Sequence, residues 1–323
     1  MNVQLRAGPT IPGIEKPISV LALGTAFYRL DEKERWFSLL DEFLRLGGTL
    51  IDSGRIYGDS EAVLGKWFER RGYRDRVVLI TKCGHGDGRL PGENIEVTVA
   101  DELDRSLECL RTDYIDLYML HRDNPSVPVG RIVDCLNATL DNGRVRALGA
   151  SNWDHMRVVA ANEYARSHGL EGFVAVSNNL SLAMPAEPFF KGLVSAGDAA
   201  QRWHAETRTP LIAWSSQARG FFTGRYSPEM LNMADTTEDS FLRRMVEVYG
   251  TDENFERLRR AQELAREKDG CSAVQVALAW LLHKPFPVIP IVGVRTEDEL
   301  TSCAAATLLE LSESELKWLN LET

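Results

Sequence analysis

Four polar residues that can share one proton-transfer reaction stand at or just beyond the ends of short apolar runs: Asp52, Tyr57, Lys82 and His121. A tyrosine, with an ordinary pKa of about 10, is a weak acid at neutral pH. A lysine ammonium beside it favours the phenolate and lowers that pKa, and an aspartate behind the lysine keeps the ammonium charged and oriented. A histidine beside the phenol can hydrogen-bond the same substrate oxygen. Such a set can protonate a carbonyl oxygen while a hydride arrives at the carbonyl carbon.

The elements that must position these residues follow from the hydrophobic pattern. Short and largely apolar runs, as expected for parallel strands covered on both faces, occur at 18–25, 48–54, 76–82, 113–120, 146–152, 173–179, 210–216 and 287–293. Between them lie amphipathic stretches that predict helices at 31–48, 59–72, 93–111, 128–143, 154–169, 254–270 and 297–308.

This alternation predicts an α/β fold, a (β/α)8 TIM barrel, in a single domain over residues 1–323. We expect long loops after strands six (183–209) and seven (217–253), and an additional helix (271–283) before strand eight. A doubly wound sheet is the alternative, but the turn after its first strand reads ALGTAFYRL, without a G-x-G-x-x-G fingerprint. In a barrel the carboxyl ends of the strands meet at one mouth, so the four polar residues should converge there.

The composition excludes several classes of function. The formal net charge of -10 argues against nucleic acid and anionic membranes as partners, because both require clustered Lys and Arg. The five cysteines form no CxxC pair, the N-terminus has no export signal, and no apolar run is long enough to span a membrane. We therefore expect reduced thiols and a cytoplasmic location. A barrel lyase or hydrolase would need a metal cluster or a carboxylate pair at the strand ends, and the sequence predicts neither there.

Six stretches carry a family resemblance, and they occur in the order typical of that family: 47–68, 79–84, 113–123, 143–153, 215–226 and 290–300. On these motifs the chain resembles the aldo-keto reductase superfamily, most closely its bacterial members related to the potassium-channel β-subunit branch. The resemblance implies a catalytic tetrad. Tyr57 would be the general acid/base, Lys82 would tune its pKa, Asp52 would pair with Lys82, and His121 would orient the substrate carbonyl.

The resemblance also implies an NADP(H) site. Ser151, Asn152 and Ser177 would contact the nicotinamide carboxamide, and Trp214 would stack on the nicotinamide ring. The loop after strand seven would hold the pyrophosphate through Ser215, Gln217, Arg219, Gly220, Phe222 and Gly224. Gly293 and Arg295 would meet the adenosine 2'-phosphate, because a guanidinium suits phosphate geometry. Glu299 and Cys303 would stand at the ribose and adenine end.

Two departures from the family pattern affect this prediction. Ser177 stands where many members have Gln, so the carboxamide contact there is shorter or bridged by water. Ser302 and Cys303 stand where a Glu-Asn pair is common at the adenine end, and this keeps NAD(H) open as a cofactor.

The expected function is the interconversion of a carbonyl (an aldehyde, ketone or sugar) and an alcohol with NADP(H). The alternative is an NADPH-binding redox-sensing module with slow turnover, like the channel β-subunits. Phe27, Tyr28 and Trp153 are candidates for lining the substrate pocket, and residues 84–94 for a loop over its mouth. His85 is interpreted as a surface or loop residue. Neither the substrate, the reaction direction nor the oligomeric state follows from the sequence.

Overall fold

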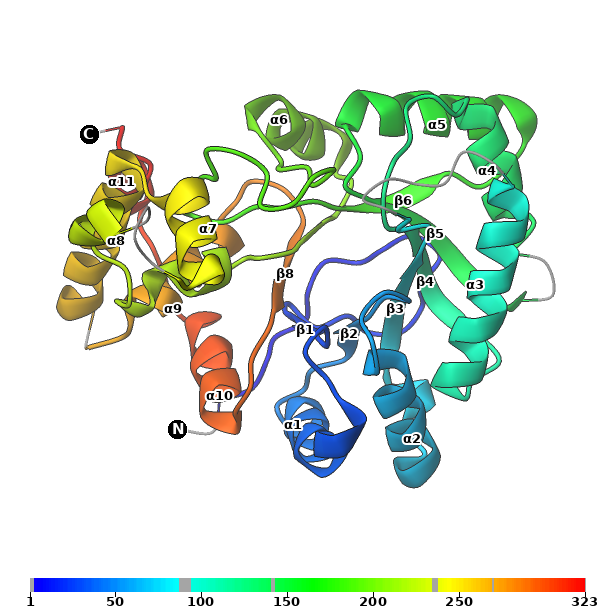
Figure 1. Ribbon diagram of the computed structural model, residues 1–323, viewed down its shortest axis with the longest axis horizontal. Coiled ribbons are helices and arrows are strands. Elements are labelled where there is room, and N and C mark those ends of the chain that lie inside the picture. Colours follow the sequence, from blue (N-terminus) through cyan, green and yellow to red (C-terminus); the bar gives the residue numbers. More distant parts are fainter. Residues whose placement is uncertain (1–2, 87–93, 141–142, 234–237, 269, 323) are drawn as a thin grey trace.

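Eight parallel strands close into a barrel in chain order, with β8 beside β1 (Figure 1). The computed structural model describes residues 3–86, 94–140, 143–233, 238–268 and 270–322. The strands are β1 Ala22–Gly24, β2 Leu50–Asp52, β3 Val78–Cys83, β4 Ile115–Leu120, β5 Val145–Ser151, β6 Phe173–Ser177, β7 Leu211–Ala213 and β8 Val288–Val292. The predicted TIM barrel is confirmed, and the alternative of a doubly wound sheet is wrong.

Helices follow the strands and surround the barrel (Figure 1). The α-helices are α1 Lys33–Arg45, α2 Ser60–Arg71, α3 Ile95–Leu110, α4 Val129–Asn137, α5 His155–His168, α6 Asp198–Thr207, α7 Ser240–Tyr249, α8 Asp252–Glu267, α9 Ala273–Leu282, α10 Glu297–Ala306 and α11 Glu313–Leu319. The 3-10 helices are η1 Leu30–Glu32, η2 Arg74–Arg76, η4 Ala218–Thr223 and η5 Pro228–Met233. Helix α9 is the additional helix expected before strand eight.

The segments expected to be long loops contain helices that the sequence did not indicate. Helix α6 lies within 183–209, and α7 lies with η4 and η5 within 217–253. The apolar stripe of α6 is weak, since its buried residues are Ala200 and His204. Helix α11 is only seven residues long. Short helices with little apolar periodicity give no clear pattern in the sequence.

Two hydrophobic layers hold the strands in place. Inside the barrel, apolar side chains from several strands pack together, among them Leu50, Ile80, Leu117, Met119 and Ile289. A larger cluster fills the space between the strands and the outer helices. The strands are thus covered on both faces, which explains why their sequences are continuously apolar. Most strands are shorter than the apolar runs that predicted them. Residues such as Ile18 and Leu21 are buried in the core although they do not belong to a strand.

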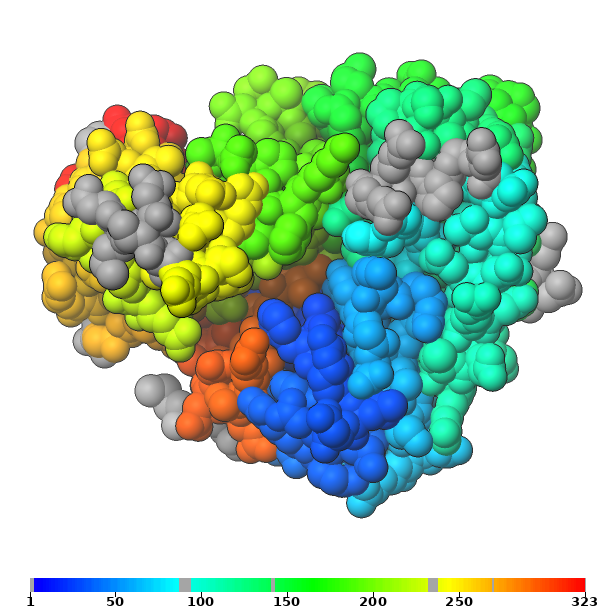
Figure 2. All heavy atoms as spheres, viewed as in Figure 1, coloured from blue at the N-terminus to red at the C-terminus, as the bar shows by residue number. Residues whose placement is uncertain are grey.

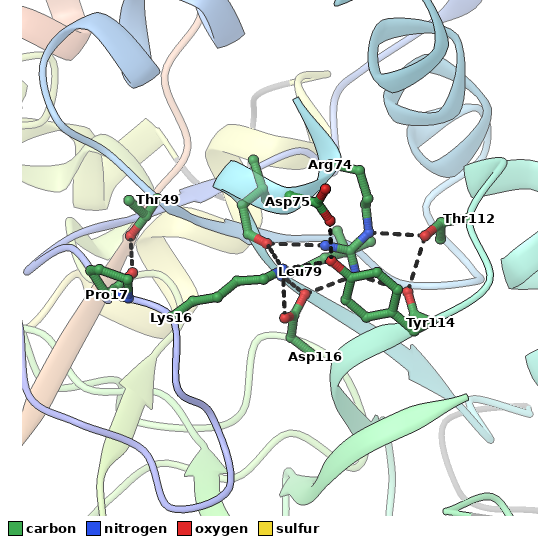
Figure 3. A network of polar contacts seen from close by, with 10 residues as sticks. Lys16, Pro17, Thr49, Arg74, Asp75, Leu79, Thr112, Tyr114 and Asp116 are labelled. Carbon is green, nitrogen blue, oxygen red and sulfur yellow. Dashed lines mark hydrogen bonds and ion pairs between the residues drawn. The ribbon is translucent and has the colours of Figure 1, made fainter. Parts of the chain in front are cut away.

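A polar network ties the N-terminal ends of the strands together (Figure 3). The buried carboxylate of Asp116, on β4, accepts a hydrogen bond from the backbone N–H of Leu79 on β3, at 2.9 Å. The same carboxylate pairs with Lys16 at 2.9 Å and with Arg74 at 2.8 Å. The Arg74 guanidinium also lies 3.8 Å from the centroid of the Tyr114 ring. The network therefore joins β3, β4, η2 and the segment around Lys16 at the end of the barrel opposite its mouth.

We expect Asp116→Asn to lower the free energy of unfolding by about 3 kcal/mol, because it leaves two shielded cations without their anion. Urea denaturation followed by circular dichroism measures this change. The matched control is Asp104→Asn, which breaks an exposed pair with Arg144 and should cost less than about 1 kcal/mol. Equal losses in the two variants would contradict a structural role for the network.

Candidate active site

The four residues of the predicted tetrad meet at the mouth of the barrel. Asp52 is the last residue of β2, Lys82 lies near the end of β3, and His121 directly follows β4. Tyr57 reaches the same place from the loop between β2 and α2, where Gly58 has a left-handed φ of 58°. Asp52, Lys82 and His121 are buried, and Tyr57 is partly buried. Neighbouring parallel strands thus bring together residues that lie far apart in the sequence.

Asp52 and Lys82 form a buried ion pair. The Lys82 ammonium contacts a carboxylate oxygen of Asp52 and donates a second hydrogen bond, of 2.7 Å, to the carbonyl oxygen of Ser53. Burial acts to lower the pKa of Lys82, but Asp52 and Tyr57 together raise it above its ordinary value. The lysine is therefore an ammonium at neutral pH, and it lies 5.1 Å from the centroid of the Tyr57 ring.

Tyr57 and His121 face one another. The Tyr57 hydroxyl lies 3.5 Å from Nε2 of His121, and the two rings meet edge to face with their centroids 5.4 Å apart. Burial lowers the pKa of His121 well below 6.5, and the charge of Lys82 acts in the same direction. The imidazole is therefore neutral at physiological pH.

The pKa of Tyr57 differs from the sequence-based expectation. Lys82 does act to lower it, but burial is the larger effect and the pKa is raised above 10. The charge of Asp52 also opposes that of Lys82. The phenol is consequently protonated at neutral pH, which suits a proton donor more than a base.

The residues expected to contact a nicotinamide lie at the ends of β5, β6 and β7. Ser151 donates to the carbonyl oxygen of Ser177 at 2.9 Å, and the Asn152 amide donates to the carbonyl oxygen of His121 at 3.1 Å. Asn152 adopts a left-handed φ of 60°, which is uncommon for a residue with a Cβ. Two buried polar atoms, Oγ of Ser177 and Nε1 of Trp214, have no hydrogen-bond partner within the described part of the chain.

The loop after β7 has a strained backbone. Ser215, Ala218 and Arg219 have left-handed φ values of 48°, 46° and 53°, and Gly220 follows with 87°. Such strain is concentrated at ligand clamps, and turns of this kind present backbone N–H groups to anions. A side-chain hydrogen bond also attaches this loop to β8. Ser216 donates to the carbonyl oxygen of Ile291 at 2.6 Å.

The side chains expected at the pyrophosphate differ in exposure. Arg219 packs its guanidinium 4.1 Å from the centroid of the Phe189 ring. Phe222 is buried, and Gly224 ends η4 with a left-handed φ of 82°. Gln217 donates to the sulfur of Cys303 at 3.2 Å, so Cys303 supports the loop from a buried position.

The segment after β8 presents a guanidinium on an aromatic surface. Arg295 lies 4.9 Å from the centroid of the Phe27 ring, and Phe27 in turn approaches Gly293. Glu299 accepts a hydrogen bond from the backbone N–H of Arg295 at 2.7 Å. Its carboxylate is therefore used to shape this segment. Arg35, which the sequence did not indicate, donates to the carbonyl oxygen of Arg295 at 2.9 Å.

The space-filling view shows a hollow in the middle of the face turned toward the viewer (Figure 2). It lies between yellow residues around α7 and blue residues near the N-terminus, with orange residues of the β8 region at its floor. Within the described residues, buried polar atoms without hydrogen-bond partners, a loop with left-handed backbone and an exposed guanidinium thus lie at or after the ends of β6, β7 and β8. These residues suit a nicotinamide cofactor.

Two residues outside the predicted set complete the site. Arg122 directly follows His121, and its Nη2 atom lies 3.2 Å from Nε2 of His85. The His85 ring is 5.0 Å from the His121 ring, centroid to centroid. His85 is a partly exposed loop residue, as expected, but it also belongs to the site, because the end of β3 places it beside the end of β4. Its position three residues after Lys82 was the available signal.

The candidate pocket residues divide between the site and the core. Tyr28 is buried and stacks on Trp36 with ring centroids 4.5 Å apart. Trp153 is buried and donates to the carbonyl oxygen of Arg122 at 3.3 Å. Both are packing residues, whereas Phe27 is exposed. Most of the loop expected over the mouth, residues 87–93, lies outside the described residues.

The described residues contain neither a cluster of metal ligands nor a membrane-spanning helix. No group of His, Cys, Asp or Glu within them is arranged to hold a metal ion. Within them, too, no helix has the length and apolar character needed to cross a membrane. Their five cysteines are all free thiols.

Comparison with known proteins gives consistent matches over nearly the whole chain. The family model described as "Aldo/keto reductase family" matches residues 20–320. Norsolorinic acid reductase B of Aspergillus parasiticus is 29% identical, over 94% of this chain and 81% of its own length. Aryl-alcohol dehydrogenase [NADP(+)] of Phanerodontia chrysosporium is 28% identical, over 90% of this chain and 76% of its own.

A solved structure is similar in fold. The crystal structure of a thermostable aldo-keto reductase in complex with the inhibitor epalrestat superposes with a TM-score of 0.70 at 22% identity. The match covers 98% of both chains. It supports the barrel architecture over the full length.

We expect Lys82→Met to lower the free energy of unfolding by about 3–5 kcal/mol, because Asp52 would remain buried without its cation. The double variant Asp52→Asn/Lys82→Met removes both charges and should recover much of that loss. Urea denaturation of wild type, both single variants and the double variant closes the cycle. Strictly additive losses would mean that the two side chains are not coupled.

Proposed function

Because the chain belongs to the aldo/keto reductase family, we propose that this oxidoreductase reduces carbonyl compounds with NADPH and that Tyr57 protonates the carbonyl oxygen. The observation that carries the proposal is the convergence of Asp52, Lys82, Tyr57 and His121 at one mouth of the barrel. Members of the family act on small-molecule carbonyl compounds. Lys82 interacts with both Asp52 and Tyr57, and the Tyr57 hydroxyl faces His121, so the four residues can act as one proton-donating group.

The nicotinamide cofactor supplies a hydride to the carbonyl carbon when it is bound. Tyr57 donates the proton to the carbonyl oxygen, so that an aldehyde or ketone becomes an alcohol and solvent returns a proton to the phenol. The raised pKa of Tyr57 keeps this proton in place at neutral pH. Lys82 stabilises the phenolate that is left behind, and Asp52 keeps Lys82 charged.

His121 orients the substrate in this mechanism. Its imidazole is neutral, because its pKa lies well below 6.5, and its Nε2 atom faces the Tyr57 hydroxyl. A neutral imidazole can donate one hydrogen bond to the carbonyl oxygen of the substrate, while Tyr57 supplies the proton that this oxygen receives. The carbonyl oxygen is thereby held between Tyr57 and His121 while charge develops on it.

The cofactor is held by the half of the mouth that β5 to β8 form. We assign the nicotinamide to Ser151, Asn152, Ser177 and the ring of Trp214, and the pyrophosphate to the strained loop after β7, including Gln217, Arg219, Gly220 and Phe222. Gly293 and Arg295 would take the 2'-phosphate. The buried, unpartnered Oγ of Ser177 supports a polar ligand at this point. Cys303 and Glu299 would act indirectly. Cys303 accepts a hydrogen bond from Gln217, and Glu299 accepts one from the backbone N–H of Arg295.

Preference for NADPH over NADH is assigned to Arg295. Its guanidinium is exposed, rests on Phe27 and makes no ion pair with a carboxylate among the described residues. The name of the Phanerodontia chrysosporium relative contains NADP(+), which agrees with this choice. NAD(H) use is the alternative outcome of the test below.

Slow redox sensing, the other function considered from the sequence, is not favoured. The relatives compared above carry the names of a reductase and a dehydrogenase. The polar residues of the tetrad are also oriented for proton transfer and not only for binding. A measured turnover on aldehydes separates the two functions.

We expect Tyr57→Phe to reduce kcat for aldehyde reduction by at least about 100-fold, because the phenol proton is lost while the ring remains. NADPH binding, measured by quenching of tryptophan fluorescence, should change little. If Tyr57→Phe turned over nearly as fast as the wild-type protein, Tyr57 would not be the acid.

We expect Arg295→Ala to weaken NADPH binding by about tenfold or more, since a charge-assisted hydrogen bond is lost. NADH binding should be nearly unaffected. The two dissociation constants are measured by the same fluorescence titration, and Arg6→Ala serves as a control for the loss of one surface charge. Equal losses for the two cofactors would mean that Arg295 does not contact the 2'-phosphate.

A further inference from the structure

Arg122 is a buried cation beside the tetrad, and neither the fold nor the proposed mechanism uses its charge. It is 5% exposed, and it is the only arginine among the described residues that is buried to this extent. Its Nε and Nη1 atoms are buried without a hydrogen-bond partner in the described part of the chain. Its Nη2 atom contacts His85. Burying a guanidinium whose N–H groups have no acceptors costs free energy, so the presence of Arg122 at this position requires an explanation.

Two other well-shielded arginines have carboxylate partners. Arg74 is 12% exposed and pairs with Asp116, and Arg157 is 18% exposed and pairs with Asp123. No carboxylate within the described ranges forms an ion pair with Arg122. Burial lowers the pKa of Arg122, and the hydroxyl of Tyr57 acts against that effect. Unlike Arg74 and Arg157, Arg122 therefore has no anionic partner within the described ranges.

The position of Arg122 indicates which ligand it faces. It follows β4 and contacts His85, which follows β3, whereas the proposed cofactor residues follow β5 to β8. Its Nη2 atom contacts His85, whose ring lies 5.0 Å from the His121 ring, centroid to centroid, so its guanidinium lies close to the tetrad. Arg122 thus stands on the side of the tetrad that is left for the substrate.

We propose that Arg122, backed by His85, binds a carboxylate group of the substrate, so that the enzyme prefers carbonyl compounds that carry a carboxylate. A guanidinium offers a planar set of N–H donors that matches a carboxylate with two hydrogen bonds, and a single cation balances a single negative charge. This inference rests on the proposed carbonyl reduction and deepens it by naming a substrate class.

The surroundings of the site suit an apolar body between the two polar groups of such a substrate. Ile56 is 53% exposed and precedes Tyr57 in the loop after β2. Phe190 is 57% exposed and lies beside Arg219, whose charge also acts on Tyr57. A carbonyl compound with a hydrocarbon or aromatic frame and one carboxylate would therefore meet apolar surface as well as Arg122.

The test compares 2-, 3- and 4-carboxybenzaldehyde with their methyl esters, which keep the shape of each acid and remove its charge. With NADPH, the wild-type protein should reduce at least one acid with a kcat/KM about tenfold or more above that of its ester. In Arg122→Gln this ratio should fall to about one. In Arg122→Lys, which keeps the charge and loses the planar donors, the ratio should be intermediate.

Arg131→Gln is the matched control, because it removes one positive charge from an exposed pair with Glu96 on α3 and α4. It should retain the acid-to-ester ratio of the wild-type protein. Equal kcat/KM values for all acids and esters, or an Arg122→Gln protein that keeps the wild-type ratio, would overturn the inference.

A binding measurement separates this inference from the proposed function. The three hydroxymethylbenzoates and their methyl esters are titrated into the NADP+-loaded protein by calorimetry, which needs no turnover. Tighter binding of an acid that is lost in Arg122→Gln supports the carboxylate site even if no aldehyde is reduced, in which case the reductase proposal fails alone. Reduction of the esters without any preference for acids, in rate or in binding, overturns the carboxylate site alone. If Arg122→Gln does not fold, the wild-type comparison and Arg122→Lys decide the matter.

Discussion

The buried ion pair between Asp52 and Lys82 is the interaction on which the rest of the site depends. Each charge would be costly alone in this environment, and each is tolerable because the other is present. The pair forms only because β2 and β3 are parallel neighbours whose carboxyl ends lie together. The closed barrel therefore provides the site, and the site in turn requires that the barrel keep these two strands in register.

The two ends of the barrel differ in how their buried polar groups are paired. At the N-terminal ends of β3 and β4, the Asp116 carboxylate is paired with Lys16, Arg74 and a backbone N–H, so its charge is balanced within the fold. At the mouth, several buried polar atoms of the described residues lack hydrogen-bond partners, including those of Arg122, Ser177 and Trp214. Because buried polar groups are nearly always satisfied, this group of unpaired atoms supports the proposal that ligands bind at the mouth.

The mouth is also divided in function. The loops after β5 to β8 carry the left-handed backbone and the guanidinium of Arg295, which suit a nucleotide with its phosphates. The ends of β3 and β4 carry His85, His121 and Arg122, which lie close together and are the residues proposed to face the substrate. Tyr57 comes from the loop after β2 and reaches between the two halves. The proposed hydride transfer requires cofactor and substrate to be held next to each other, and such a division of the mouth would allow this.

Much of this protein could be predicted from the sequence. The alternation of apolar runs and amphipathic stretches determined the barrel, because that pattern reflects which faces of each element are buried. Its motifs also determined which four residues to expect at the mouth. Only the tertiary structure decided the protonation of Tyr57, because the effect of burial on its pKa exceeds that of Lys82. It also decided that Trp153 and Tyr28 belong to the core and that His85 and Arg122 belong to the site. Burial and unmet hydrogen bonds depend on how separate strands assemble, and no local pattern in the sequence records them.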